Sequence, residues 1–240
     1  MMTRNLVCEM IGTFALTFIG AGSILLSAWQ GQPGLVGIAF AHGLALAIAV
    51  TATMNISGGH INPAVTVTML VTGRIKPGPA GLYIVAQCVG ATIAGFILKY
   101  LFENLGAIDK VTGVQAIKDC FLGTPSFKAA LVSPGLIVML EAILTFFLLF
   151  AVFGTAVDPR APKVGGFGIG LTVCMDILAG GPISGAAMNP ARTIGTLIGG
   201  GSYTADLWSQ HWVYWVGPIA GGVIAGLVYD WFIMDRSPAR

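Results

Sequence analysis

Charged side chains are scarce in this sequence. Only 9% of its 240 residues are Asp, Glu, Lys or Arg, whereas 55% are hydrophobic and the mean hydropathy is +0.85. A water-soluble domain carries about 25% charged residues, so the composition excludes that class and indicates a protein of the lipid bilayer. The net charge of +2 is small, and nothing in it favours a nucleic-acid partner.

Cysteine and histidine are also few, at four and three residues. Neither shows the spacing of a metal site or a disulfide framework. We therefore expect no metal, no cofactor and no catalytic residue, and the protein is not expected to be an enzyme. Inert packing is the favoured interpretation of all four cysteines, which are Cys8, Cys88 and Cys174 in apolar stretches and Cys120 in a polar loop.

The sequence contains long runs without a charged residue, and the longest covers residues 10–73. Because a bilayer core needs about 20 apolar residues per helix, these runs predict six membrane-spanning helices. The N-terminal run shows no cleavage pattern and is predicted to be a retained span. We place the spans at residues 6–28, 35–54, 82–102, 136–155, 167–178 and 212–233, with the fifth starting nearer Val164.

The distribution of Lys and Arg between the loops predicts the orientation. One side would hold Arg4, Arg74, Lys76, Arg160, Lys163, Arg236 and Arg240, and the other Lys99, Lys110, Lys118 and Lys128. By the positive-inside rule both termini are expected in the cytoplasm. The short termini favour the plasma (inner) membrane of a prokaryote.

Two apolar stretches, residues 62–72 and 189–198, are too short to be spans. As helices each would rise about 15 Å, half of a core about 30 Å thick. Each follows a polar, glycine-rich segment whose backbone could not face lipid without unsatisfied amides. We predict two re-entrant half-helices; the alternative, two surface loops, would expose a row of apolar side chains to water.

The chain also repeats itself. Residues 56–66 align without a gap on residues 183–193 and are identical at seven of eleven positions. Three spans per copy is an odd number, so the second copy enters the membrane in the opposite sense. Other matching pairs are residues 9–14 with 141–146 and residues 83–95 with 214–226. We expect a single domain over residues 1–240 with internal repeats 1–128 and 129–240.

Each half-helix begins with Asn-Pro-Ala, at Asn62-Pro63-Ala64 and Asn189-Pro190-Ala191. An Asn oxygen is a good N-cap and Pro suits the first helical position, which would leave the Asn amide NH2 groups free. Inversion predicts that Asn62 and Asn189 face each other near the bilayer centre, backed by two positive helix ends. A water that turns its oxygen toward them cannot relay a proton, and cations meet a positive field.

On these motifs and the repeat around them, the chain resembles the aquaporin (major intrinsic protein) family from end to end, especially its tonoplast-type, ammonia-permeable and prokaryotic members. The resemblance implies an all-α membrane protein with the aquaporin fold, that is, six transmembrane helices plus two re-entrant half-helices in an inverted repeat. It implies a passive water channel that excludes protons, with ammonia or other small neutral solutes as further permeants. Its partners would be these solutes, membrane lipid and three further copies in a homotetramer.

The resemblance also assigns roles to residues. Glu9 and Glu141 become buried acceptors that hold the two re-entrant loops. An intramembrane carboxylate requires a partner, which supports this role independently, against the alternative that both acids reach the headgroups. The backbone carbonyls implied to line the pore are those of Gly58, Gly59, His60, Gly185, Ala186 and Ala187.

The family's selectivity filter falls on His42, Ile177, Ala186 and Arg192. An Arg within the second half-helix is too costly in lipid to be incidental, and it can hydrogen-bond water while it repels cations; snorkelling to the interface is the alternative. Water-selective members carry a second His where this chain has Ile177. A branched alkyl group there predicts a wider, less polar filter that favours neutral ammonia. Ala186 stands where a mercury-reactive Cys often lies, so we expect little mercury block at the filter.

Two other permeation classes stay open. A glycerol or small-polyol facilitator is disfavoured by Thr193 and by the pair Tyr214-Trp215, which are typical of water-conducting members. An ion-coupled secondary transporter shares inverted repeats and broken helices but needs an acid at the membrane centre. Asp176 is the one loose candidate, and a buried hydrogen bond between helices is favoured for it over a filter role. The extra filter His of some ammonia-permeable relatives is absent, since Ser126 or Phe127 falls near that position.

Overall fold

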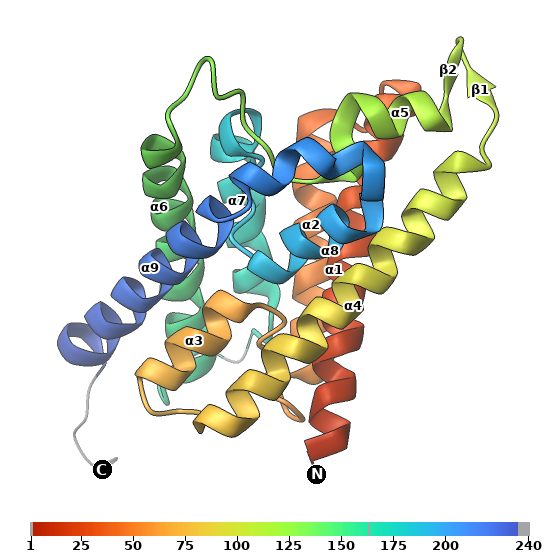
Figure 1. Cartoon of the computed structure of the whole chain (residues 1–240). Coiled ribbons are helices and arrows are strands. Elements are labelled where there is room, and N and C mark those ends of the chain that lie inside the picture. The colour runs from red at the N-terminus through yellow and green to blue at the C-terminus, as the bar shows by residue number, and fades with distance from the viewer. Residues whose placement is uncertain (1, 163, 235–240) are drawn as a thin grey trace.

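The structure is a computed structural model that describes residues 2–162 and 164–234, so Lys163, Arg236 and Arg240 lie outside the described residues. Within these ranges the chain is almost wholly helical (Figure 1). The six predicted spans are confirmed as helices long and apolar enough to cross a membrane. They are α1 (Met2–Gln30), α2 (Gly34–Thr53), α4 (Pro77–Glu103), α6 (Pro134–Val152), α7 (Phe167–Ser184) and α9 (Val213–Val228), with π-helical turns η2 (Phe153–Val157) after α6 and η4 (Tyr229–Ile233) after α9.

Helix α7 differs from its predicted bounds at both ends. It begins at Phe167 and not near Val164, because Gly165 adopts φ +59° and the Gly166 N–H donates to Thr51 Oγ1 of α2 at 2.9 Å. It also continues to Ser184, past Pro182, whereas the predicted span ended at residue 178. Proline is tolerated within a membrane-spanning helix when neighbouring groups satisfy the freed carbonyl.

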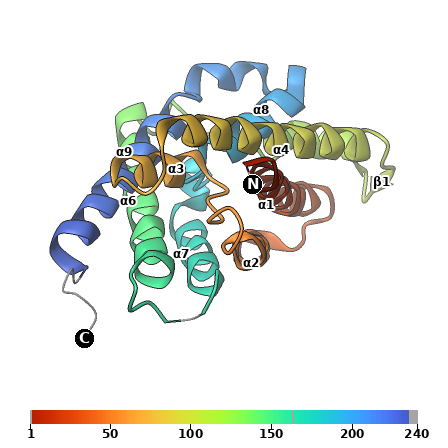
Figure 2. The same cartoon turned by 90° about the horizontal axis from the view of Figure 1, so that it is seen from below.

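The two predicted half-helices are present as α3 (Pro63–Val71) and α8 (Pro190–Gly200). Figure 1 shows α3 entering from the end where α1 begins and α8 from the end that carries α5. Helix α4 packs along α8 and helix α9 packs along α3, so each half-helix has a full span beside it. Figure 2, seen from below, shows α8 alongside α4 and α3 beside α9 and α4.

The end opposite the start of α1 carries elements that the hydropathy pattern did not predict. Strands β1 (Ala107–Ile108) and β2 (Val111–Thr112) form an antiparallel hairpin that leads into helix α5 (Gly113–Cys120) and the 3-10 turn η1 (Phe121–Gly123). A longer 3-10 segment, η3 (Gly201–Gln210), follows α8. Because α5 is short and amphipathic, it gave no apolar run that the sequence analysis could detect.

Glycines allow several helices to approach closely. A Cβ placed at Gly95 of α4 would lie 2.5 Å from the carbonyl oxygen of Gly195 in α8, and one at Gly221 of α9 would overlap the carbonyl oxygen of Ala142 in α6. Small residues at such crossings are how helices associate in lipid, where apolar burial adds little. The outward surface is apolar, with Ile48 68% and Val85 60% exposed.

The end of the molecule where α1 begins is joined by ion pairs. Arg74 binds Asp230 at 2.7 Å and lies over the Phe153 ring at 5.0 Å. Arg160 binds Asp158 at 2.7 Å. The hydrogen-bonded Arg160 guanidinium lowers the pKa of Asp158 to about 2, so this carboxylate stays charged throughout the physiological pH range. The first pair ties the loop after α3 to the segment after α9, and the Arg160 Nη2 ties the segment after α6 to the same place by donating to the Ile233 carbonyl oxygen at 3.2 Å.

Replacement of Gly221 by Ala should loosen the α6 and α9 pair, because the new methyl group has no space beside Ala142. Overpacking of this kind costs about 1–3 kcal/mol. We expect Gly221→Ala to lower the thermal unfolding temperature in detergent. The matched control is Gly81→Ala in α4, where an added Cβ meets nothing within 4 Å. Equal melting of the two variants would contradict this account of the interface.

Candidate functional site

The two Asn-Pro-Ala motifs form the helix starts expected of them. The Asn62 Oδ1 accepts from the Ala64 N–H at 2.8 Å, and the Asn189 Oδ1 accepts from the Ala191 and Arg192 N–H groups at 3.1 and 3.2 Å. Proline occupies the first helical position in both. Both half-helices therefore present capped N-termini, and the positive ends of two helix dipoles, at one place.

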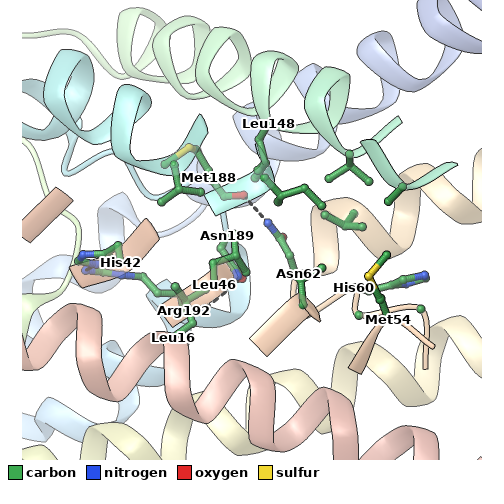
Figure 3. Close-up of a pocket in the computed structure, with 18 of the residues that line it drawn as sticks. Leu16, His42, Leu46, Met54, His60, Asn62, Leu148, Met188, Asn189 and Arg192 are labelled. Carbon is green, nitrogen blue, oxygen red and sulfur yellow. Dashed lines mark hydrogen bonds between the residues drawn. The ribbon is translucent and has the colours of Figure 1, made fainter. Parts of the chain in front are cut away.

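The tips of the half-helices are also linked directly. The Asn62 Nδ2 donates to the Met188 carbonyl oxygen at 2.8 Å, and the Asn189 Nδ2 donates to the Ile61 carbonyl oxygen at 2.9 Å (Figure 3). The expectation of wholly free amides was wrong in this respect. An amide NH2 carries two donors, so one N–H of each Asn is used across the tips and one remains for a solute.

The residues before each Asn adopt an unusual backbone. Ile61 and Met188 have φ of +55° and +51°, a region that costs an L-residue about 1–2 kcal/mol. Their carbonyl groups are the acceptors of the two cross-tip hydrogen bonds. The left-handed conformation is therefore part of the reciprocal link between the loops.

Two buried carboxylates hold the non-helical segments. Glu9 of α1 accepts from the N–H groups of His60 and Ile61 at 3.0 and 2.6 Å and from the Ser57 hydroxyl at 2.7 Å. Both Glu9 and Glu141 are 0% exposed. Glu141 of α6 has the same three partners in the second copy, namely the N–H groups of Ala187 and Met188 and the Ser184 hydroxyl, at 2.9, 2.8 and 2.6 Å.

Several supporting residues were not singled out from the sequence. The Tyr83 hydroxyl donates to the Ser57 carbonyl oxygen, and the Tyr214 hydroxyl donates to the Ser184 carbonyl oxygen, at 2.9 and 2.8 Å. Gln87 adds a fourth donor to Glu9 at 2.7 Å. The signal was available, because Tyr83 aligns with Tyr214 and Ser57 with Ser184 in the internal repeat.

A cavity of about 210 Å³, hereafter the conduit, runs past the linked tips. Its polar side carries Asn62, Asn189 and Arg192, and Figure 3 places His42 at one end of it and His60 at the other. Most of the remaining lining is apolar. Its side chains include Leu16, Leu46, Val50, Val65, Met69, Leu148, Val152, Ile169, Val173 and Ile177.

The predicted pore-lining backbone divides between two cavities. Gly58, Gly59 and His60 line the conduit on one side of the tips, and Ala186 and Ala187 on the other. Gly185 instead lines a second cavity on the α5 side. The His60 ring does more than expected, since its Nδ1 lies 3.1 Å from the Thr66 hydroxyl and the ring packs edge-on against Tyr83.

The four predicted filter residues all line the conduit, and they come from three helices and one loop. His42 comes from α2, Ile177 from α7, Ala186 from the loop before α8, and Arg192 from α8. An Arg192 Nη2 lies 3.2 Å from the His42 Nε2. A guanidinium cannot accept, so the His42 Nε2 is the acceptor and its Nδ1–H donates to the Ile38 carbonyl oxygen at 2.9 Å.

One nitrogen of the Arg192 side chain lacks a hydrogen-bond partner among the described residues. Arg192 is only 3% exposed, and its Nη1 is the nitrogen for which the described residues supply no partner. Because a buried guanidinium N–H needs a partner, this nitrogen is available to whatever occupies the conduit.

Asp176 lies away from both cavities. It is 1% exposed, and its Oδ2 has no partner in residues 2–162 or 164–234. The burial agrees with the sequence interpretation of a buried hydrogen bond between helices, but the Oδ2 makes no such bond within the described residues. Asp176 does not line the conduit, so it is not placed as a filter residue.

Comparison with known proteins identifies the architecture. The family described as Major intrinsic protein matches residues 1–229. The chain is 43% identical to Aquaporin TIP4-4 of Zea mays over 242 residues, covering 97% of this chain and 88% of that protein. It is 42% identical to Aquaporin TIP2-1 of Arabidopsis thaliana over 243 residues, covering 98% and 89%.

A solved structure has the same fold. The X-ray structure of the aquaglyceroporin from Plasmodium falciparum superposes with a TM-score of 0.83 and covers 97% of each chain at 23% identity. At this identity the likeness concerns the fold alone. The matches along the sequence are what decide membership, and by them this chain belongs to the major intrinsic protein family, the aquaporins.

Proposed function

We propose that this chain is a passive water channel and that the conduit is its pathway. One observation carries the proposal: the amides of Asn62 and Asn189 reach across to each other's loop, so two positive helix ends meet beside one narrow cavity. The relatives named as aquaporins support the same conclusion.

Proton exclusion follows from the charges at the tips. Each helix N-terminus carries about half a positive charge, and each Asn has one N–H left to donate. A water at this point turns its oxygen toward both amides, so its own hydrogens point along the conduit in both directions. It cannot accept a proton from a neighbouring water, as in aquaporin-type pores generally.

The apolar part of the conduit lining allows rapid passage. Leu148, Val152 and Val173 offer no hydrogen bonds, so a water is held only on its polar side. Conduction needs binding weak enough for the solute to leave, and a one-sided row of donors provides it. Arg192 adds a buried positive charge at the filter, which repels cations.

The filter also bears on which solute passes. His42 already accepts from Arg192, and Ile177 is an alkyl group, so Arg192 Nη1 is the principal donor left at this level. A filter with few donors compensates the lost hydration of water less well than a richer one. It therefore favours a less strongly hydrated neutral solute, and we propose ammonia as a second permeant.

The assembly and location are further parts of the proposal. We propose a homotetramer with one pore per chain, each chain a single channel domain over residues 1–240 with repeats 1–128 and 129–240. We propose both termini in the cytoplasm of the plasma (inner) membrane. This orientation is supported by Arg74, Lys76 and Arg160 near the start of α1, and by Lys110 and Lys118 in the hairpin and α5 at the opposite end.

The direct test is osmotic shrinkage of proteoliposomes in a stopped-flow instrument. We expect fast water flux that needs no ion gradient, with an activation energy well below that of protein-free vesicles. The internal pH should stay constant under an imposed proton gradient. Flux that required a sodium or proton gradient would favour a coupled transporter instead.

Glu141→Gln tests the support of the second loop. The amide NH2 would oppose N–H donors of Ala187, Met188 or the Ser184 hydroxyl, and each lost charge-assisted hydrogen bond costs about 1.5–3 kcal/mol. We expect a lower melting temperature and a loss of most water flux per folded channel. Glu103→Gln, at an exposed position, is the control and should behave as wild type. A Glu141→Gln channel with normal flux and stability would remove this role.

Ile177→His tests the solute proposal. A ring donor at this position adds a hydrogen bond worth about 0.5–1.5 kcal/mol, or roughly 2- to 10-fold in relative rate. We expect the ratio of ammonia to water permeability, measured in the same vesicles, to fall by several fold, while Ile177→Val leaves it unchanged. If wild-type vesicles show no ammonia flux above protein-free vesicles, the ammonia proposal is wrong and the water channel stands.

A further inference from the structure

A second cavity, hereafter the outer vestibule, adjoins the conduit on the side of α5. It encloses about 290 Å³. His42, Ile177 and Arg192 line both cavities, so the filter is the neck that joins them. Anything fixed in the outer vestibule therefore lies in the path of a solute that moves toward the filter.

One cysteine lines this vestibule. Cys120 is the last residue of α5, is half-buried, and donates its thiol hydrogen to the Ala116 carbonyl oxygen at 3.1 Å. The chain then reverses through left-handed Phe121 and Leu122, which brings Thr124 and Pro125 onto the vestibule wall. Cys120 packs against the cluster of Ala116, Ile117 and Leu122, as the interpretation of inert packing predicts, and it also lines the vestibule.

The other three cysteines are differently placed. Cys174 is buried where α7 crosses α2 at Gly43, and Cys8 and Cys88 lie on α1 and α4. None of the three lines the conduit or the outer vestibule. They serve as internal controls for any reagent that acts from within the pathway.

The vestibule also contains polar groups that lack partners. Arg192 is 3% exposed with a free Nη1, and Thr124 is 6% exposed with a free Oγ1, among the described residues. Both residues line the same cavity as Cys120. A fixed positive charge with a spare N–H, a spare hydroxyl and a thiol together suit a small anion that carries a thiol-reactive group.

We propose that Cys120 is a covalent modification site, selective for small anionic thiosulfonates and disulfides, and that its adduct closes the conduit at the filter. The block rests on the proposed function, whereas the modification itself does not. In the reaction with a thiosulfonate, the Cys120 thiolate attacks the sulfenyl sulfur and forms a disulfide. Methanesulfinate leaves with the electron pair of the broken bond, and the thiol proton goes to water.

The thiol should react slowly near neutral pH. Burial raises the pKa of Cys120 to about 11; Asp119 on its own helix also raises it, while Arg192 of α8 lowers it. Since the thiolate is the nucleophile, the rate should rise about tenfold per pH unit between pH 7 and 9.

The experiment compares three methanethiosulfonates on proteoliposomes, with reagent on both faces of the membrane. They are the anionic sulfonatoethyl, the cationic trimethylammonioethyl and the neutral methyl compounds. Rates of adduct formation come from intact mass, are divided by each reagent's rate with a free small thiol, and are followed beside water flux. We expect the anionic reagent to modify the protein about tenfold faster than the cationic one and to abolish most flux.

Two variants identify the cysteine that forms the adduct and causes the block. Cys88→Ser should keep both the adduct and the block, and Cys120→Ser should lose both, each flux being compared with that of the same variant untreated. Block that persists in Cys120→Ser, a faster cationic reagent, or a Cys120 adduct with unchanged flux would each overturn the proposal. If the untreated channel does not conduct water, the proposed function fails, and adduct formation with its charge preference still decides the modification site.

Discussion

The hydrogen bonding of two non-helical backbone segments at membrane depth is the constraint on which this structure depends. An unsatisfied amide in hydrocarbon costs several kcal/mol, so the segments before α3 and α8 are tolerated only with internal partners. Glu9 and Glu141 provide them, each accepting from two backbone N–H groups and a serine hydroxyl. The carboxylates in turn are stable in the interior because these donors replace water.

This mutual dependence fixes the geometry of the conduit. With the loops held by α1 and α6, Ile61 and Met188 adopt their left-handed conformations and their carbonyls meet the amides of the opposite tip. The two halves are not equivalent. Gln87 gives Glu9 a further donor, whereas the repeat places Pro218 at the corresponding position near Glu141. Each loop donates three hydrogen bonds to its acid, but Glu141, which holds the loop before Arg192, lacks the fourth donor that α4 gives to Glu9.

The sequence predicts this framework well because its causes are local. Hydropathy runs give the spans, Asn-Pro gives each cap, and the repeated motif gives the inversion. The sequence does not predict features that depend on contacts between residues far apart in the chain. The cross-tip hydrogen bonds join residues more than a hundred positions apart, and α7 continues past Pro182 to Ser184. Helix α5 was missed because an eight-residue amphipathic segment has no apolar run.

The filter shows how one hydrogen bond sets the chemistry of a narrow site. Since Arg192 can only donate, its contact with His42 fixes the imidazole with Nε2 as acceptor and Nδ1–H on the Ile38 carbonyl. His42 then has no donor left to offer a solute, and Ile177 never had one. The donors that remain at this level are the Arg192 N–H groups that His42 does not accept, and Ile177 adds none. Selection at this proposed filter is expected to depend on size and on the exclusion of cations more than on the number of hydrogen bonds, in agreement with the proposed passage of small neutral molecules.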